Sequence, residues 1–108
     1  MENLDQTAEK IRLEFERKNA ARDKAYQSSR ELIRLCARAI RAVHREEWET
    51  AETLIVEARE ATEELVSGVR DYPHLYFAGY TQDAIKEFVE ANLTYALVRN
   101  RPLPRPEE

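Results

Sequence analysis

The chain has very little of what interrupts helices or cross-links a fold. Among its 108 residues are two glycines, four prolines and one cysteine. A single cysteine excludes a disulfide framework within the chain, and we expect this thiol, Cys36, to fill a small place in an apolar core. Scarce turn formers, with 43% apolar and 35% charged residues, are typical of an all-α protein and exclude collagen-like and disordered classes.

Long apolar runs are missing as well. No segment approaches the roughly 18 apolar residues that a membrane span requires, and the first ten residues are charged and lack the apolar centre of a signal peptide. We therefore expect no membrane partner and a cytoplasmic protein. The length predicts one domain, over residues 1–101, followed by a proline-rich tail at residues 102–108.

The net charge of −4 conceals an uneven distribution. Residues 1–45 carry eleven basic and seven acidic side chains, residues 46–71 two and nine, and residues 72–108 four and five. A basic N-terminal segment is the electrostatic footprint of nucleic-acid binding, although an acidic chain argues against unspecific binding of polyanions. We expect RNA, or alternatively single-stranded DNA, as the partner.

A long first helix is predicted because no proline or glycine occurs between Asp5 and His44. Its heptad-like seam comprises Leu4, Ala8, Ile11, Phe15, Lys18, Arg22, Ala25, Ser29, Leu32, Cys36, Ala39 and Val43. The seam is polar in the middle, at Lys18, Arg22 and Ser29. Such a break marks a functional or assembly site, or else a solvent gap where the helix extends past its neighbours.

The predicted length of this helix also implies association. About 40 residues make a helix of about 60 Å, whereas a compact domain of this size has a radius of gyration of about 13 Å. One copy cannot cover such a helix. We expect a homo-oligomer or a complex with a similar partner chain.

Arginines recur every three or four residues along the second half of this helix and form a basic stripe. The members are Arg30, Arg34, Arg38, Arg41 and Arg45. Pairing with acids of the following segment is favoured for the C-terminal half of the stripe. Arg30 and Arg34, together with Lys18 and Arg22 upstream, are the candidates for contact with nucleic acid.

Two further helices are predicted, over residues 49–67 and 81–98. The first has the apolar face Ala51, Leu54, Ile55, Ala58, Thr62, Leu65 and Val66 and ends at Gly68. The second has the apolar side Ile85, Phe88, Val89, Leu93, Ala96 and Leu97. Between them lie the aromatic residues His74, Tyr76, Phe77 and Tyr80, which suit core or subunit contact more often than base stacking.

The last helix also carries Asp83, Glu87 and Glu90 in one row. Like charges a turn apart cost a helix about 0.2–0.5 kcal/mol per pair, so the row is either a solvated face or a cation site. A similar row at Glu57, Glu60 and Glu64 supports the first reading. Spacing alone leaves both open.

The amino-acid sequence resembles the translin family, and most of all its archaeal members that are similar to translin-associated factor X. Residues 87–91, Glu-Phe-Val-Glu-Ala, followed by the Pro-Leu-Pro exit at residues 102–104, are similar to the Glu-Tyr-Val-Glu-Ala helix of that family. The segment RDKAYQSSR at residues 22–30 matches an arginine-dotted first helix, and LYFAG at residues 75–79 the lead-in to the acidic helix. The resemblance covers residues 4–104 and the N-terminal half of the family fold.

This resemblance implies an antiparallel helical bundle in a hollow oligomer that works as a metal-dependent endoribonuclease. Glu87 and Glu90 would be catalytic and bind Mg²⁺ or Mn²⁺, and Arg22 and Arg30 would face RNA. The family completes its site with an acidic residue on a later helix, and this sequence stops near the point where that half begins. Either the sequence is a fragment, or the third ligand comes from another chain, or the protein binds RNA without cutting it. A non-catalytic nucleic-acid-binding or assembly module is therefore the alternative.

A weaker resemblance points to a different nuclease. Arg38 and His44 have the spacing of the arginine and histidine in the HEPN group of small, metal-independent ribonucleases. Alanines flank the arginine here, where that group has a polar residue, and a histidine at a helix C-terminus is more simply a favourable partner of the helix dipole.

Overall fold

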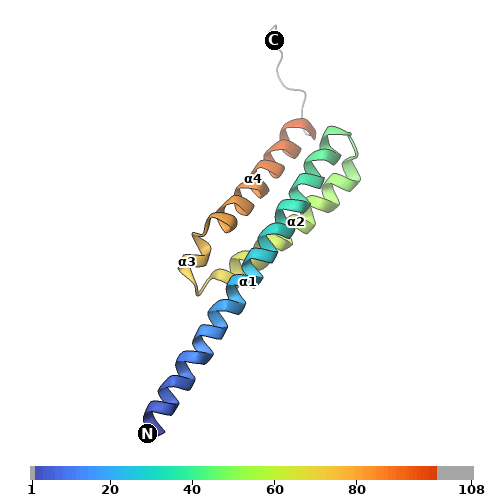
Figure 1. Ribbon diagram of the computed structural model, residues 1–108. Helices are drawn as coiled ribbons and strands as arrows, with labels where there is room; N and C mark the ends of the chain where they lie inside the picture. Colours follow the sequence, from blue (N-terminus) through green and yellow to red (C-terminus); the bar gives the residue numbers. More distant parts are fainter. Residues whose placement is uncertain (1, 100–108) are drawn as a thin grey trace.

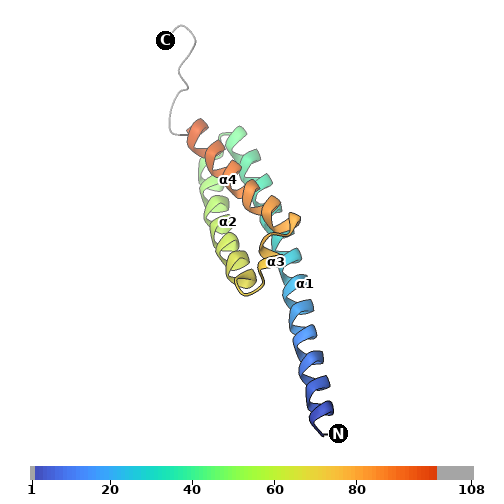
Figure 2. The same ribbon diagram turned by 90° about the vertical axis from the view of Figure 1, so that its left-hand side faces the viewer.

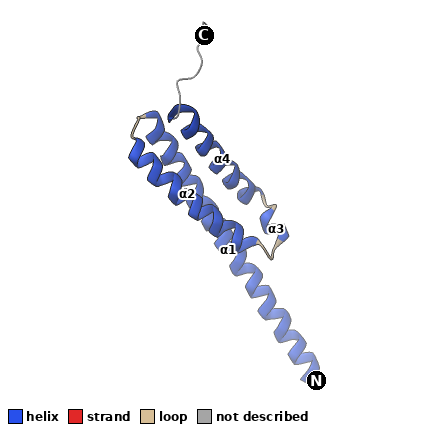
Figure 3. Ribbon diagram, turned by 180° about the vertical axis from the view of Figure 1, so that it is seen from behind, coloured by secondary structure: helices blue, strands red, loops and turns tan. Residues whose placement is uncertain are grey.

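The computed structural model describes residues 2–99, and these residues form helices joined by short loops (Figure 1; Figure 3). The elements are α1 (Glu2–His44), α2 (Trp48–Val69), α3 (Pro73–Tyr76) and α4 (Gly79–Arg99). Within residues 2–99 there is no strand, so the predicted all-α class and the long first helix are confirmed. The predicted tail at residues 102–108 lies outside the described part of the chain.

The helices are arranged as an elongated bundle with one helix much longer than the others. α2 runs back along the C-terminal half of α1, and α4 then runs antiparallel to α2 beside both (Figure 1; Figure 2). The N-terminal half of α1 projects from the bundle without a neighbour (Figure 2). The radius of gyration is accordingly 19.7 Å. No helix within the described range combines the length and apolar character of a membrane span.

The turn between α1 and α2 closes with a pair of hydrogen bonds that ends α1. The amide of Glu46 donates to the carbonyl of Val43 at 3.0 Å, and the amide of Glu47 donates to the carbonyl of Ala42 at 2.9 Å. This is the Schellman pattern, in which the residue after the helix adopts a left-handed conformation and is usually glycine. Glu46 takes that place with φ 59°.

The core is built largely from small side chains, which bring the helices close together. Its buried members are Ala25, Leu32, Leu35, Cys36, Ala39, Ala42 and Val43 of α1, Ala51, Leu54, Ile55, Ala58, Leu65 and Val69 of α2, Leu75 of α3, and Ala84 and Ala91 of α4. The predicted apolar face of α2 is confirmed, with Thr62 and Val66 half-buried at its edge. Cys36 is fully buried, as expected for a core thiol.

The predicted apolar side of α4 is wrong for most of its members. Phe88 packs against the core as expected, but Val89 and Leu93 are exposed. The fully buried residues are Thr81, Ala84 and Ala91, and aromatic side chains pack beside them. α4 is apolar on two sides, so periodicity does not decide which side faces the bundle.

Ser29 also departs from its expected place in a polar gap. Its side chain is completely buried, as is that of Thr81, and neither hydroxyl has a hydrogen-bond partner among the described residues. The polar interruption of the seam is therefore limited to Lys18 and Arg22, which lie outside the bundle. A serine is tolerated in the core because its small volume suits the close approach of the helices.

Candidate nucleic-acid interface and acidic pair

Two of the four predicted RNA-binding residues lie on the projecting part of α1. Ala25 is the first buried residue of this helix. The preceding segment, residues 3–24, contains no buried side chain, and we call it the overhang. Lys18 and Arg22 are exposed there, and neither forms an ion pair with any residue between 2 and 99. Their charges are therefore available to an external anion.

Arg30 is the third of these residues and is positioned by an aromatic pair. Its guanidinium carbon lies 5.9 Å from the centre of the Tyr26 ring, within the range of a cation–π contact. Tyr26 in turn meets Tyr80 of α4 edge-on, with ring centres 5.4 Å apart. This links the basic side of α1 to the first turn of α4.

Tyr26 is a candidate that the sequence interpretation overlooked. It is 46% exposed and lies one turn after Arg22 and one turn before Arg30. The signal for it was the four-residue spacing of a basic, an aromatic and a basic residue, an alternation that single-stranded nucleic-acid sites use for stacking and charge neutralisation.

Arg34, the fourth predicted residue, is occupied by a neighbour. Its Nε and one terminal nitrogen donate to the two carboxylate oxygens of Glu31 at 3.0 Å and 2.6 Å. This hydrogen bonding lowers the pKa of Glu31. An open hollow of about 370 Å³ is lined by Gln27, Arg30, Glu31 and Arg34. Arg34 thus differs from the other three residues in having a carboxylate partner.

The ion pairs expected between the C-terminal half of the basic stripe and the acids of α2 are absent from the described residues. Arg38, Arg41 and Arg45 are exposed and line an open hollow of about 220 Å³ with Thr50. Within the described residues none of the three forms an ion pair with an acid of α2. The acids of α2 are exposed, and Glu52 accepts a hydrogen bond from the Tyr95 hydroxyl at 2.5 Å.

Of the acidic pair on α4, Glu87 lies on the side next to Cys36 of α1. Glu87 is half-buried and Glu90 is exposed. Burial, and after it the negative charge of Glu87, raises the pKa of Cys36 to about 11. In residues 2–99 no group of three or more histidine, cysteine, aspartate or glutamate side chains is arranged to hold a metal ion. Two carboxylates alone do not make a complete site for Mg²⁺, which needs near-octahedral oxygen coordination.

The arginine and histidine of the rival nuclease resemblance are both exposed. Arg38 lies on the second half of α1 and His44 at its end. Six residues advance a helix by about 600°, which leaves the two side chains about 120° apart around its axis. They therefore do not lie on one face of the helix.

The aromatic segment before α4 divides between core and surface. Tyr80 is half-buried against the core, whereas Phe77 is 72% exposed. Tyr76 and Phe77 meet edge-on at 4.9 Å between ring centres, and Tyr72 and His74 do so at 6.3 Å. Core contact is thus confirmed for Tyr80 alone among the four.

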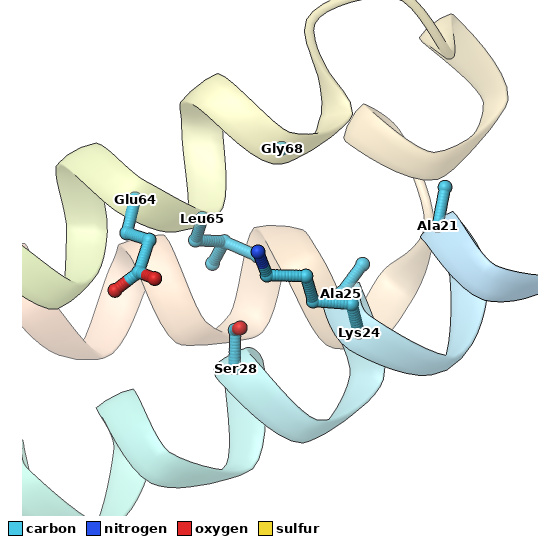
Figure 4. A pocket seen from close by; sticks show the side chains of 7 residues that line it. All are labelled: Ala21, Lys24, Ala25, Ser28, Glu64, Leu65 and Gly68. Carbon is cyan, nitrogen blue, oxygen red and sulfur yellow. The ribbon is translucent and has the colours of Figure 1, made fainter.

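A small hollow lies where the overhang leaves the bundle, between α1 and α2 (Figure 4). Its lining includes Lys24, Glu64, Leu65 and Gly68, and Lys24 extends toward Leu65 of the facing helix. The volume is about 10 Å³, which is room for about one water molecule. This hollow therefore offers no ligand site.

Comparison of the chain with protein-family models, with curated proteins and with solved structures gives no match.

Proposed function

We propose that this chain is an RNA-binding subunit of a translin-like helical assembly, and that RNA follows Lys18, Arg22, Tyr26 and Arg30 along α1. The observation that supports this most directly is that the three cationic side chains are exposed and have no carboxylate partner among residues 2–99. A phosphate binding there does not have to displace an internal ion pair first.

The order of these residues suits a single strand. They lie within about one third of the helix circumference and extend about 18 Å along it. Cations neutralise the phosphates, and the exposed ring of Tyr26 offers a face on which an unpaired base stacks. The Tyr80 contact holds that ring in place, which lowers the entropy lost on binding.

RNA binding by arginine variants tests this path. We expect Arg22→Ala to weaken binding of single-stranded RNA and to reduce the salt slope of log K by about 0.7 for each phosphate that the variant no longer neutralises. Arg34→Ala is the matched control, because Glu31 already occupies that guanidinium. If Arg22→Ala leaves affinity and salt slope unchanged, or if Arg34→Ala has the larger effect, this path is wrong.

Association of several chains is part of the same proposal. Residues 3–20 of the overhang, about 27 Å of helix, contain no buried side chain. Most helical stability in proteins comes from the packing of an apolar face, which this segment lacks. Its apolar residues are strongly exposed, with Leu4 at 67% and Ile11 and Phe15 at 63%. Sedimentation that gives a single chain of 12.7 kDa at all concentrations would contradict association.

A metal-dependent nuclease is the second candidate, because Glu87 and Glu90 have no cationic partner in the described residues. A complete site requires a further ligand from another chain or segment. If the pair binds Mn²⁺, the ion raises the melting temperature, and Glu87→Gln with Glu90→Gln abolishes the increase.

The matched control for this metal test is Glu57→Gln with Glu60→Gln on α2. Both of those carboxylates are exposed and belong to a row of the same spacing. An equal response to Mn²⁺ from the wild type and both double variants removes the metal assignment and leaves the RNA-binding subunit.

A further inference from the structure

Two exposed apolar stripes lie on different helices of the molecule. The overhang stripe consists of Leu4, Ala8, Ile11 and Phe15. The α4 stripe consists of Ile85, Val89, Leu93 and Leu97, of which the last three are 50%, 56% and 43% exposed. Exposed apolar surface in continuous stripes marks interaction sites, whereas scattered apolar residues need no explanation.

The overhang stripe continues a packed interface. Its residues belong to the same heptad seam as Ala25, Leu32 and Cys36, which pack against α2 and α4. Before Ala25 the helix leaves the bundle and has no neighbouring helix (Figure 1). The heptad spacing keeps the seam on nearly the same side of the helix, with a drift of about 20° per heptad. A helix equivalent to those in the bundle is therefore expected to cover it.

The α4 stripe faces away from α1 and is as long as the overhang stripe. It is centred on the side of the helix opposite the buried residues Ala84 and Ala91, so α4 exposes large apolar side chains to solvent. From Ile85 to Leu97 the stripe measures about 18 Å, and from Leu4 to Phe15 the overhang stripe measures about 17 Å.

We propose that two copies of this chain form an antiparallel, two-fold symmetric dimer in which the overhang stripe of each copy packs on the α4 stripe of the other. α4 then lies between its own α1 and the overhang of the partner, and each bundle gains a fourth long helix. This inference rests on the proposed association of chains and is independent of RNA binding.

The dimensions of α1 fix the position of the symmetry axis. The overhang, residues 3–24, is about 33 Å long, and the packed part, residues 25–44, is about 30 Å long. A two-fold axis near Lys24 therefore places each overhang beside the whole bundle of the other copy. Such an interface closes on itself and leaves neither stripe free for a third chain.

The contacts of α4 with α1 set the register. Tyr26 lies beside Tyr80, which fixes the relative height of the two helices. With the axis at Lys24, Phe15 of one copy comes to the height of residue 87 in the other, between Ile85 and Val89. Leu4 then comes to the height of residue 98, next to Leu97, so the two stripes overlap over nearly their full length.

The polar break in the seam fits this arrangement. Arg22 falls near the symmetry axis and passes the first turn of α4, before its apolar stripe begins, and Lys18 comes to the N-terminal edge of that stripe. If the overhang packed instead on the overhang of the other copy, the α4 stripe would remain exposed. The polar break in the seam would then have no explanation.

Cross-linking distinguishes these pairings. We expect a short bis-maleimide to link Ile11→Cys chains to Leu93→Cys chains after the two variants are mixed. Leu13→Cys with Val98→Cys is the matched control, because both positions are exposed but lie on other sides of their helices. Wild-type Cys36 stays in place, since it is buried.

Three cross-linking results would contradict the proposed dimer. In the proposed dimer the two Ile11 positions are about 39 Å apart along the molecule, so Ile11→Cys chains alone do not link. A link between Ile11→Cys chains, equal linkage of the control pair, or no linkage at all overturns the proposal.

Sedimentation supplies an independent test that needs no reagent. Leu93→Asp and Ile11→Asp each convert the dimer to the 12.7 kDa chain, whereas Val98→Asp and Leu13→Asp leave the mass doubled. Ile11 lies outside the bundle, so its substitution does not unfold the core. Dimers that survive both stripe substitutions overturn the proposal. RNA is absent from these measurements, so their failure leaves the RNA path standing.

Discussion

The turn between α1 and α2 stores strain in one residue. Glu46 has φ 59°, a region where a side chain crowds the following carbonyl at a cost of about 1–2 kcal/mol. Glycine has no such penalty. We expect Glu46→Gly to raise the free energy of unfolding by about 1 kcal/mol, measured by urea denaturation.

The neighbouring residue provides the control for this prediction. Glu47 has φ −88° and needs no left-handed conformation. Glu47→Gly therefore adds only the backbone entropy of glycine to the unfolded chain and is expected to lower stability. A loss of stability from Glu46→Gly as well would show that its side chain contributes more than its backbone costs.

Cys36 makes stability depend on alkaline pH. Burial, with the charge of Glu87, raises its pKa from 9.0 to about 11. Between these values the unfolded chain loses the thiol proton while the folded chain keeps it, so the folded state binds more protons and the free energy of unfolding falls as pH rises.

Unfolding in urea at several pH values between about 8 and 11 measures this effect. Cys36→Ala is expected to show a smaller decline with pH than the wild type, although it is less stable at every pH because of the cavity. The hydrogen bond to Glu52 also raises the pKa of Tyr95, and that contribution is the same in both proteins. Identical pH profiles would contradict the assignment to Cys36.

For the individual helices, the sequence predicts where each helix begins and ends. It predicts less well which side of a helix faces the solvent. The absence of proline and glycine predicts α1, and Gly68, Pro73 and Gly79 lie at or next to the ends of α2, α3 and α4. The face of α2 follows from its period because only one side is apolar. α4 has two apolar sides, and the choice between them depends on the space left by α1 and α2, which no local pattern contains.

At the candidate site too, the exposure of side chains was predictable from the sequence, whereas the contacts between helices were not. Exposure of Lys18, Arg22 and Arg30 follows from their charge and spacing. The pairing of Arg34 with Glu31 is a local effect at three residues' separation, readable in principle from the sequence. The lack of ion pairs between the end of the basic stripe and α2 was not readable, because it depends on how two helices are rotated about their axes.

The overhang is the element whose order depends most on a partner. Within it, Arg12 pairs with Glu9 and Glu16, which supports an exposed helix by only a few tenths of a kcal/mol per pair. We expect amide hydrogen exchange in residues 3–20 to be slow in the wild type and fast in Leu93→Asp, with residues 30–44 protected in both. Equal exchange of the overhang in the two proteins would mean that no chain covers it.

For the whole molecule, dimerisation and RNA binding are expected to reinforce each other. With α4 between two α1 helices, the two basic segments lie about 16–20 Å apart. An RNA that spans both binds the dimer more tightly than the single chain, because its second contact is intramolecular. We expect RNA of about 16 nucleotides to lower the dissociation constant of the dimer and RNA of about four nucleotides to leave it unchanged.

Sedimentation with each RNA measures this coupling, and Arg22→Ala is the variant that removes it. Because coupling free energies are reciprocal, the factor by which long RNA tightens the dimer equals the factor by which dimerisation tightens RNA binding. Equal effects of long and short RNA on the dissociation constant of the dimer would exclude a strand shared by both copies.

The polar break at Lys18 and Arg22 therefore has a consequence for how assembly is controlled. A seam apolar throughout would hold two chains together under all conditions and would make the dimer insensitive to its surroundings. Two cations in the middle of the seam make the contact between the chains less stable than a fully apolar seam of the same length. They also make the stability of the dimer depend on the concentration of polyanion. The fraction of chains held as dimers is therefore expected to rise with the concentration of RNA, so that the assembly reports RNA abundance.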